Sequence, residues 1–118
     1  FKDRHPPPRA VLVEPQGSVW GGGPAGPHKV EGIGNSFLPK ILDRSLIDEV
    51  VAVTDRDAFA TVRLLARREG LLVGGSSGGV GFAAARVARQ IGPRRKIVTL
   101  FSDGSERYLS QGIFDEVT

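Results

Sequence analysis

The sequence contains no cysteine and no methionine, and it has one tryptophan and one tyrosine. Without cysteine the chain can form no disulfide and supplies no thiol for catalysis. Its two histidines, His5 and His28, are far apart and each lies beside a proline, so no metal site is expected. No apolar run reaches the roughly 18 residues that a membrane helix needs, and no secretion signal is visible. These absences predict a cytoplasmic protein without a membrane partner.

The charge pattern gives little support for nucleic-acid binding. The formal net charge is +3, but the basic residues do not gather with aromatic residues into a stripe. The one tight basic run, at residues 94–96, directly precedes an apolar strand candidate, where a solvated lead-in is ordinary. We therefore expect no nucleic-acid partner.

The length of 118 residues suits one modest core and is too short for two. Residues 1–9 are polar and hold three successive prolines, which indicates a surface connector rather than a translation start. Glycine and proline dominate residues 16–34, which predicts a long loop. We expect one domain or part of one, in a chain that is processed, truncated or incompletely represented.

Short apolar runs alternate with helical patterns along the rest of the chain. One helix is expected between Thr54, which can cap it, and Gly70, and a second is expected to end at Gly92. A short helical segment is expected around residues 106–110. Strands are expected at residues 10–14, 48–54, 71–73 and 96–101. This alternation predicts a three-layer α/β fold, with a mostly parallel sheet and flanking helices.

A glycine-serine turn at residues 74–79 joins an expected strand to a helix. Free backbone N–H groups and the helix dipole favour an anion at such a position. No Lys-Ser or Lys-Thr pair follows the glycines, so the stricter phosphate-loop pattern fails. The structural alternative is a tight turn with close helix packing, in which Ser76 or Ser77 caps the helix. The turn alone leaves both interpretations open.

The same turn and its helix, residues 73–92, also resemble the nucleotide-binding segment of medium-chain NAD(P)-dependent reductases. In such enzymes an acidic residue follows about 20 residues further on, and Asp103 could fill that role. A nicotinamide-dependent reductase is therefore an alternative function.

Several short motifs outside this turn occur in an order that a reductase does not explain. They are Val13-Glu14-Pro15, Gly26-Pro27-His28-Lys29, Glu31-Gly32-Ile33-Gly34, Phe37-Leu38-Pro39, Leu42-Asp43, Asp48-Glu49-Val50, Glu69-Gly70-Leu71-Leu72 and the segment 102–110. Their order and spacing resemble those of cysteine synthases and cystathionine β-synthases. The resemblance covers nearly the whole chain.

This resemblance implies that residues 1–118 form the C-terminal portion of a catalytic domain, in a two-domain fold of the tryptophan-synthase β-subunit type. Such enzymes bind pyridoxal 5'-phosphate and make cysteine or cystathionine from serine or O-acetylserine and a sulfide or thiol. The cofactor supplies the electron sink for this β-replacement. Family members are commonly homodimers, so a homodimer is expected. A non-catalytic homologue is a further alternative.

The resemblance also implies particular site residues. Gly32, Ile33 and Gly34 match a glycine loop at the cofactor, where Gly32 and Gly34 let the substrate lie close to the backbone. A turn that needs glycine is the structural alternative.

The serine that meets the pyridine nitrogen in the family falls on Gly104 in this sequence. Ser105 and Ser102 are the candidates to take its role, with Asp103 or a water molecule as further alternatives.

None of the four lysines occurs in the sequence context of the family's Schiff-base lysine. The family's substrate-carboxylate loop and phosphate cup are also missing. We therefore expect no catalytic residue in this chain, which should be inactive by itself. The remainder of the enzyme is expected as missing sequence or as a separate chain.

Overall fold

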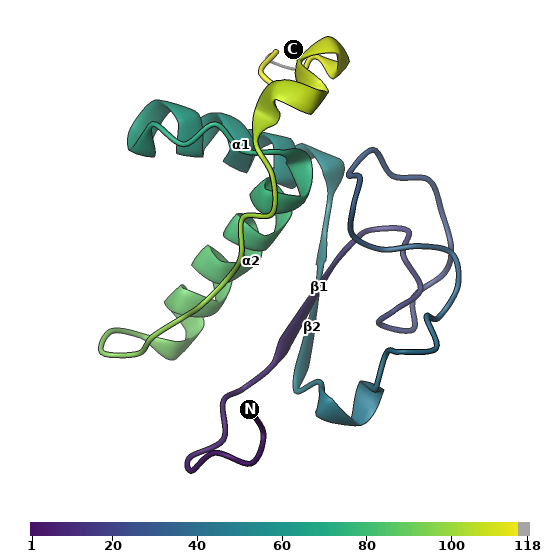
Figure 1. The fold of residues 1–118 in the computed structure, drawn as a ribbon, viewed down its shortest axis with the longest axis vertical. Helices are drawn as coiled ribbons and strands as arrows, with labels where there is room; N and C mark the ends of the chain where they lie inside the picture. The colour runs from purple at the N-terminus through teal and green to yellow at the C-terminus, as the bar shows by residue number, and fades with distance from the viewer. Residues whose placement is uncertain (116–118) are drawn as a thin grey trace.

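Two parallel strands and two long helices carry the fold in the computed structural model, which describes residues 1–115 (Figure 1). Strand β1 (Val11–Pro15) pairs in parallel with β2 (Glu49–Val53), and Val13 lies opposite Val51. Both strands are rich in valine, whose branched side chain favours a pleated surface. The two predicted strands at residues 10–14 and 48–54 are confirmed, and so is the α/β class with a parallel sheet.

Helix α1 (Asp55–Glu69) begins and ends at the residues that the sequence predicts. The Thr54 side chain accepts a hydrogen bond of 3.1 Å from the N–H of Asp57, which satisfies one free donor of the first turn. Gly70 ends the helix in the left-handed conformation, with φ of 68°. Local capping chemistry therefore determines both ends of α1.

Helix α2 (Gly75–Ile91) packs closely on α1 because its first turns are made of small residues. A Cβ atom added to Gly78 would lie 2.2 Å from the carbonyl oxygen of Ala58 in α1. Glycine at this position therefore lets α2 approach the backbone of α1. The helix ends at Gly92, as predicted.

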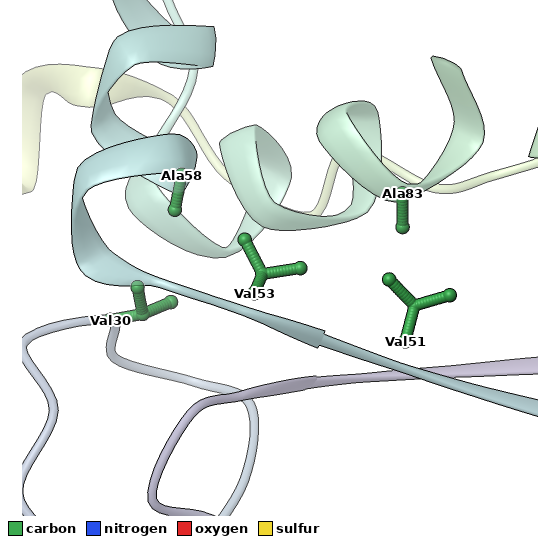
Figure 2. Packing of buried hydrophobic residues seen from close by; sticks show 5 residues of the cluster. All are labelled: Val30, Val51, Val53, Ala58 and Ala83. Carbon is green, nitrogen blue, oxygen red and sulfur yellow. The ribbon is translucent and has the colours of Figure 1, made fainter. Parts of the chain in front are cut away.

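The main core lies between β2 and the two helices. Figure 2 shows Val51 and Val53 of β2 directed toward Ala58 of α1 and Ala83 of α2, with Val30 from the preceding loop closing the cluster. All five side chains are at most 3% exposed. Burying each valine contributes about 1.5–3 kcal/mol. This packing holds both helices against one face of the sheet.

Two of the predicted strands are not formed among residues 1–115. Val73 makes only an isolated bridge with Gly104, and residues 96–101 are extended without a paired neighbour. The sheet described here has two strands, and both long helices lie on one face, so the predicted three-layer arrangement is not seen in this part of the chain. The apolar pattern of a segment predicts extended backbone, but the partner of a strand is a long-range property that the pattern does not contain.

The remaining segments are loops and short helical turns. The turns are η1 (Arg44–Leu46) and η2 (Ser105–Gln111), and η2 confirms the helical segment expected around residues 106–110. Residues 16–34 contain no helix or ladder strand. Among residues 1–115, no helix has the length and apolar character needed to cross a membrane.

Candidate functional site

Three segments meet at the N-terminus of α2. The hydroxyl oxygens of Ser76 and Ser102 lie 3.2 Å apart, and the N–H of Ser102 donates to the hydroxyl of Ser77 over 3.2 Å. We call Ser76, Ser77 and Ser102 the serine cluster. From a third segment, Gly32 lies so close that an added Cβ atom would be 3.8 Å from the Ser76 hydroxyl. Ser76 and Ser77 are buried, whereas Gly32 and Ser102 are exposed. The exposed pair therefore flanks two buried hydroxyls.

The prediction that Ser76 or Ser77 caps α2 is wrong. The N-cap is Gly74, and no side chain makes a cap hydrogen bond there. Ser76 and Ser77 lie inside the first turn, where their hydroxyls turn to Ser102 instead. The N-terminus of α2 therefore keeps the free N–H groups and positive dipole end that favour an anion.

The backbone of the loop at residues 32–34 depends on glycine at two positions, for two different reasons. Gly32 and Gly34 have φ of 89° and 83°, a region that residues with a side chain rarely adopt. A Cβ atom on Gly34 would lie 2.5 Å from Cδ of Pro15, so glycine is required where the loop crosses the end of β1. A Cβ atom added to Gly32 would make only ordinary van der Waals contact with Ser76, and Ile33 packs against the main core. The close approach to Pro15 thus explains Gly34, while at Gly32 only the positive φ favours glycine beside the serine cluster.

The segment after Ser102 is fixed by its own contacts. The N–H of Gly74 donates to the carbonyl of Asp103 over 3.2 Å, and the N–H of Ser105 donates to the carbonyl of Leu72 over 3.2 Å. The hydroxyl of Tyr108 donates to one oxygen of the Asp103 carboxylate. This hydrogen bond, followed by burial, raises the pKa of Tyr108 above its ordinary value. The turn is therefore held rigidly against the start of α2.

One carboxylate oxygen of Asp103, in the turn that follows Ser102, has no hydrogen-bond partner in the described part of the chain. Its Oδ1 atom is buried and has no hydrogen-bond partner within residues 1–115. A buried acceptor without a partner costs free energy. Asp103 therefore carries one buried acceptor that the described residues do not satisfy.

The structure separates the candidate residues for the pyridine contact. Ser102 is exposed and joins the serine cluster, whereas Ser105 is only 4% exposed. Gly104 pairs with Val73, and Asp103 is engaged by Tyr108. Ser102 is thus the candidate that faces both solvent and the Ser76 hydroxyl.

Ser76 and Ser77 are not among the site residues that the sequence predicts. The signal was present in the Gly-Ser-Ser-Gly turn, but the hydroxyls were read only as helix caps. Their partner lies 25 to 26 residues further along the chain, so only the tertiary structure reveals the cluster.

The chain belongs to the pyridoxal-phosphate dependent enzyme family, whose model matches residues 1–103. It is 44% identical over 115 residues to the O-acetylserine dependent cystathionine beta-synthase of Bacillus subtilis (strain 168), a match that covers 98% of this chain and 38% of the relative. It is 42% identical over 114 residues to the cysteine synthase of Helicobacter pylori (strain ATCC 700392 / 26695), which covers 97% of this chain and 37% of the relative.

Solved structures give the same result. The crystal structure of the O-acetylserine dependent cystathionine beta-synthase from Helicobacter pylori matches with a TM-score of 0.86 and 42% identity, covering 96% of this chain and 37% of that chain. The O-acetyl serine sulfhydrylase isoform 3 from Entamoeba histolytica matches with a TM-score of 0.90 and 30% identity, covering 99% of this chain and 36% of that chain.

These comparisons confirm the resemblance, the fold class and pyridoxal 5'-phosphate as the cofactor of the family. The reductase alternative is not favoured. The chain spans a little over one third of the length of these relatives.

The residues present fit one wall of a pyridoxal-phosphate site. The free N-terminus of α2 and the hydroxyls of the serine cluster are groups that a polar aromatic ligand can use. No lysine side chain hydrogen-bonds to the serine cluster in the described part of the chain, and Lys2 pairs instead with Asp48. Residues 1–115 also contain no group of three or more metal-ligating side chains.

Proposed function

We propose that the complete protein is a pyridoxal-phosphate dependent β-replacement enzyme, which makes cysteine or cystathionine from serine or O-acetylserine and a sulfide or thiol. The observation that carries this proposal is the meeting of Gly32, Ser76 and Ser102 at one end of the sheet, in a chain 44% identical to an O-acetylserine dependent cystathionine beta-synthase. Ligands bind at the carboxyl ends of parallel strands in open α/β sheets. β1 ends at Pro15, against which Gly34 lies, and the N–H of the next residue, Gln16, donates to the carbonyl of Val53 at the end of β2.

In this proposal the loop of Gly32, Ile33 and Gly34 borders the cofactor and the substrate. Gly32 has no side chain and is exposed beside Ser76, so a substrate can lie against its backbone. Ile33 anchors the loop by packing against the main core, and Gly34 keeps it against Pro15. In this proposal Gly32 contacts the substrate, while Ile33 and Gly34 hold the loop in place.

Ser102 is proposed as the partner of the pyridine nitrogen, with Ser105, Gly104 and Asp103 disfavoured by their positions. The Ser102 side chain is exposed and is held by Ser76. A hydroxyl, unlike a carboxylate, leaves the ring nitrogen mostly uncharged, and the cofactor then serves as an electron sink for β-elimination. Asp103 is held away from this role by its hydrogen bond from Tyr108.

The Schiff-base lysine, the substrate-carboxylate loop and the phosphate cup are proposed to come from the rest of the enzyme. Residues 1–118 are the C-terminal portion of the catalytic domain and have no activity alone. We further propose a cytoplasmic homodimer that acts on small-molecule substrates, without nucleic-acid or membrane partners.

The test uses the complete protein. Titration with pyridoxal phosphate should produce a visible absorbance band, whereas titration with a nicotinamide dinucleotide should produce no spectral change. The loaded protein should then form cysteine from O-acetylserine and sulfide, or cystathionine when homocysteine replaces sulfide. A spectral change with the dinucleotide alone would support the reductase. Cofactor binding without any product would support the non-catalytic homologue.

A further inference from the structure

The loop at residues 31–34 is held by hydrogen bonds on its two sides rather than by bonds of its own. Among residues 1–115, the backbone of these four residues takes part in no hydrogen bond. On the N-terminal side, the N–H groups of Lys29 and Val30 donate to the Asp55 carboxylate over 2.8 and 3.3 Å. The position of the loop therefore depends on the residues that flank it.

On the C-terminal side, Asn35 makes three hydrogen bonds to one short segment, residues 18–20. Its N–H donates to the Ser18 hydroxyl over 3.3 Å, and its carbonyl accepts from the N–H of Val19 over 3.0 Å. Its side-chain oxygen accepts from the indole N–H of Trp20, and both of these residues are half-buried. We call these three bonds the Asn35 tether. It joins the end of the loop to a segment 15 residues earlier in the chain.

The segment 18–20 is itself attached to β1. The N–H of Ser18 donates to the carbonyl of Pro15 over 3.0 Å, and the N–H of Gly21 donates to the Glu14 carboxylate over 3.0 Å. Glu14 is only 4% exposed, so this second bond is shielded from water. Trp20 lies between these two attachment points. Its indole is therefore held in place from the sheet.

The contact with Trp20 also determines which half of the Asn35 amide is used. An indole N–H can only donate, so the atom that faces it is the amide oxygen and not the NH2 group. A carboxylate at this position could accept the same bond, whereas an aliphatic side chain of similar size could not. The side-chain bond of the tether can therefore be removed from either partner, and it can be kept by one conservative change.

We infer that Trp20 is a positioning residue for the amino-acid substrate, because through Asn35 it holds the loop in the place where the backbone of Gly32 meets that substrate. This inference rests on the proposed function, in which the substrate lies against Gly32. Gly32 is three residues from Asn35, and it lies beside the Ser76 hydroxyl. Trp20 acts on the substrate only through the loop and needs no contact with it.

A positioning role has a different kinetic signature from a purely structural one. A loop that loses its tether spends part of its time away from the binding position, and the apparent affinity falls by the fraction of time in which the loop is competent. Saturating substrate restores the competent position, so KM rises while kcat is kept. A bond that only stabilises the fold would lower the free energy of unfolding and leave KM unchanged.

A double-mutant cycle in the complete protein tests this inference. Trp20→Phe removes the donor and Asn35→Leu removes the acceptor. Each should raise KM for the amino-acid substrate about 2- to 10-fold, the factor that one hydrogen bond gives, with kcat and pyridoxal-phosphate affinity unchanged. The double variant should show no further rise, because both changes remove the same bond. Asn35→Asp, which keeps an acceptor, should retain the original KM, and so should the control Ser36→Ala at the exposed next residue.

Three results would overturn the positioning role in an enzyme that forms product. They are an unchanged KM in Trp20→Phe, rises that multiply in the double variant, and a fall in kcat and cofactor affinity as large as the rise in KM. If both Asn35 variants raise KM and Trp20→Phe does not, Asn35 contacts the substrate directly and Trp20 has no role. A complete, unmodified protein that forms no product removes the proposed function and this inference with it, whereas product formed with equal KM values removes this inference alone.

Discussion

Ser76 and Ser102, 26 residues apart in the sequence, hold their hydroxyl oxygens 3.2 Å apart. This contact ties the first turn of α2 to the end of the extended segment 96–101. It also directs two hydroxyls to the end of the sheet that Gly32 borders. The serine cluster is therefore a meeting point of helix, strand segment and loop, and three of the four predictions below concern residues that form or support it.

Replacing Ser102 with alanine in the complete protein should weaken pyridoxal-phosphate binding by about 2- to 10-fold, because one hydrogen bond contributes roughly 0.5–1.5 kcal/mol. The absorbance of the bound cofactor should also change, since its ring nitrogen loses a polar partner. Fluorescence titration and the visible spectrum measure the two effects. Ser110→Ala, on the exposed side of η2, is the matched control and should change neither. If Ser105→Ala alters the spectrum and Ser102→Ala does not, Ser105 has the role.

Replacing Gly78 with alanine should destabilise the complete protein by about 1–3 kcal/mol, because the added methyl group overpacks the contact with α1. The new Cβ would meet the Ala58 carbonyl at 2.2 Å, and a backbone atom cannot rotate away. Gly81→Ala on the same helix is the control. Its nearest contact would be an ordinary 3.4 Å, and alanine favours helix over glycine by up to about 1 kcal/mol. Chemical denaturation should therefore show opposite signs, and equal losses would contradict the packing described.

The glycine loop should respond differently at its two glycines. Gly34→Ala and Gly32→Ala both place a side chain at positive φ, but only Gly34→Ala also drives a methyl group to 2.5 Å from Pro15. We expect Gly34→Ala to cost about 2 kcal/mol more in the free energy of unfolding. Gly32→Ala should instead raise KM for the amino-acid substrate while the fold persists. A Gly32→Ala enzyme with unchanged KM would remove the proposed substrate contact.

The bond between Tyr108 and Asp103 predicts a pH dependence. Because the pKa of Tyr108 is raised in the folded state by this bond, its contribution to stability is complete below the ordinary pKa of 10.0 and is lost as the pH rises through the folded value. Tyr108→Phe should lower the free energy of unfolding at neutral pH by about 1–3 kcal/mol, since it leaves a partly buried acceptor unpaired. The difference from the unmodified protein should shrink in alkaline solution.

Asp103→Asn is the companion variant, because its amide oxygen can still accept from the phenol. It should be milder than Tyr108→Phe at neutral pH. Denaturation of the three proteins over a series of pH values makes the comparison. A constant difference between Tyr108→Phe and the unmodified protein up to strongly alkaline pH would contradict this account of the bond.

By itself, the sequence determined the class of the fold, the family, both ends of α1 and the C-terminal end of α2. Caps such as Thr54 and Gly70 act on neighbouring backbone groups, so short-range chemistry is enough to locate them. The short motifs that indicate the family are local in the same way. Each one is a run of neighbouring residues whose types can be read directly from the sequence.

Only the tertiary structure decided which segments meet. It paired β1 with β2, left residues 96–101 without a neighbour in the described part of the chain, and brought Ser76 to Ser102. An apolar pattern states that a segment is extended and buried, but its partner depends on contacts between residues far apart in the sequence. For the same reason the two serines, read as helix caps in the sequence, are part of the candidate site in the fold.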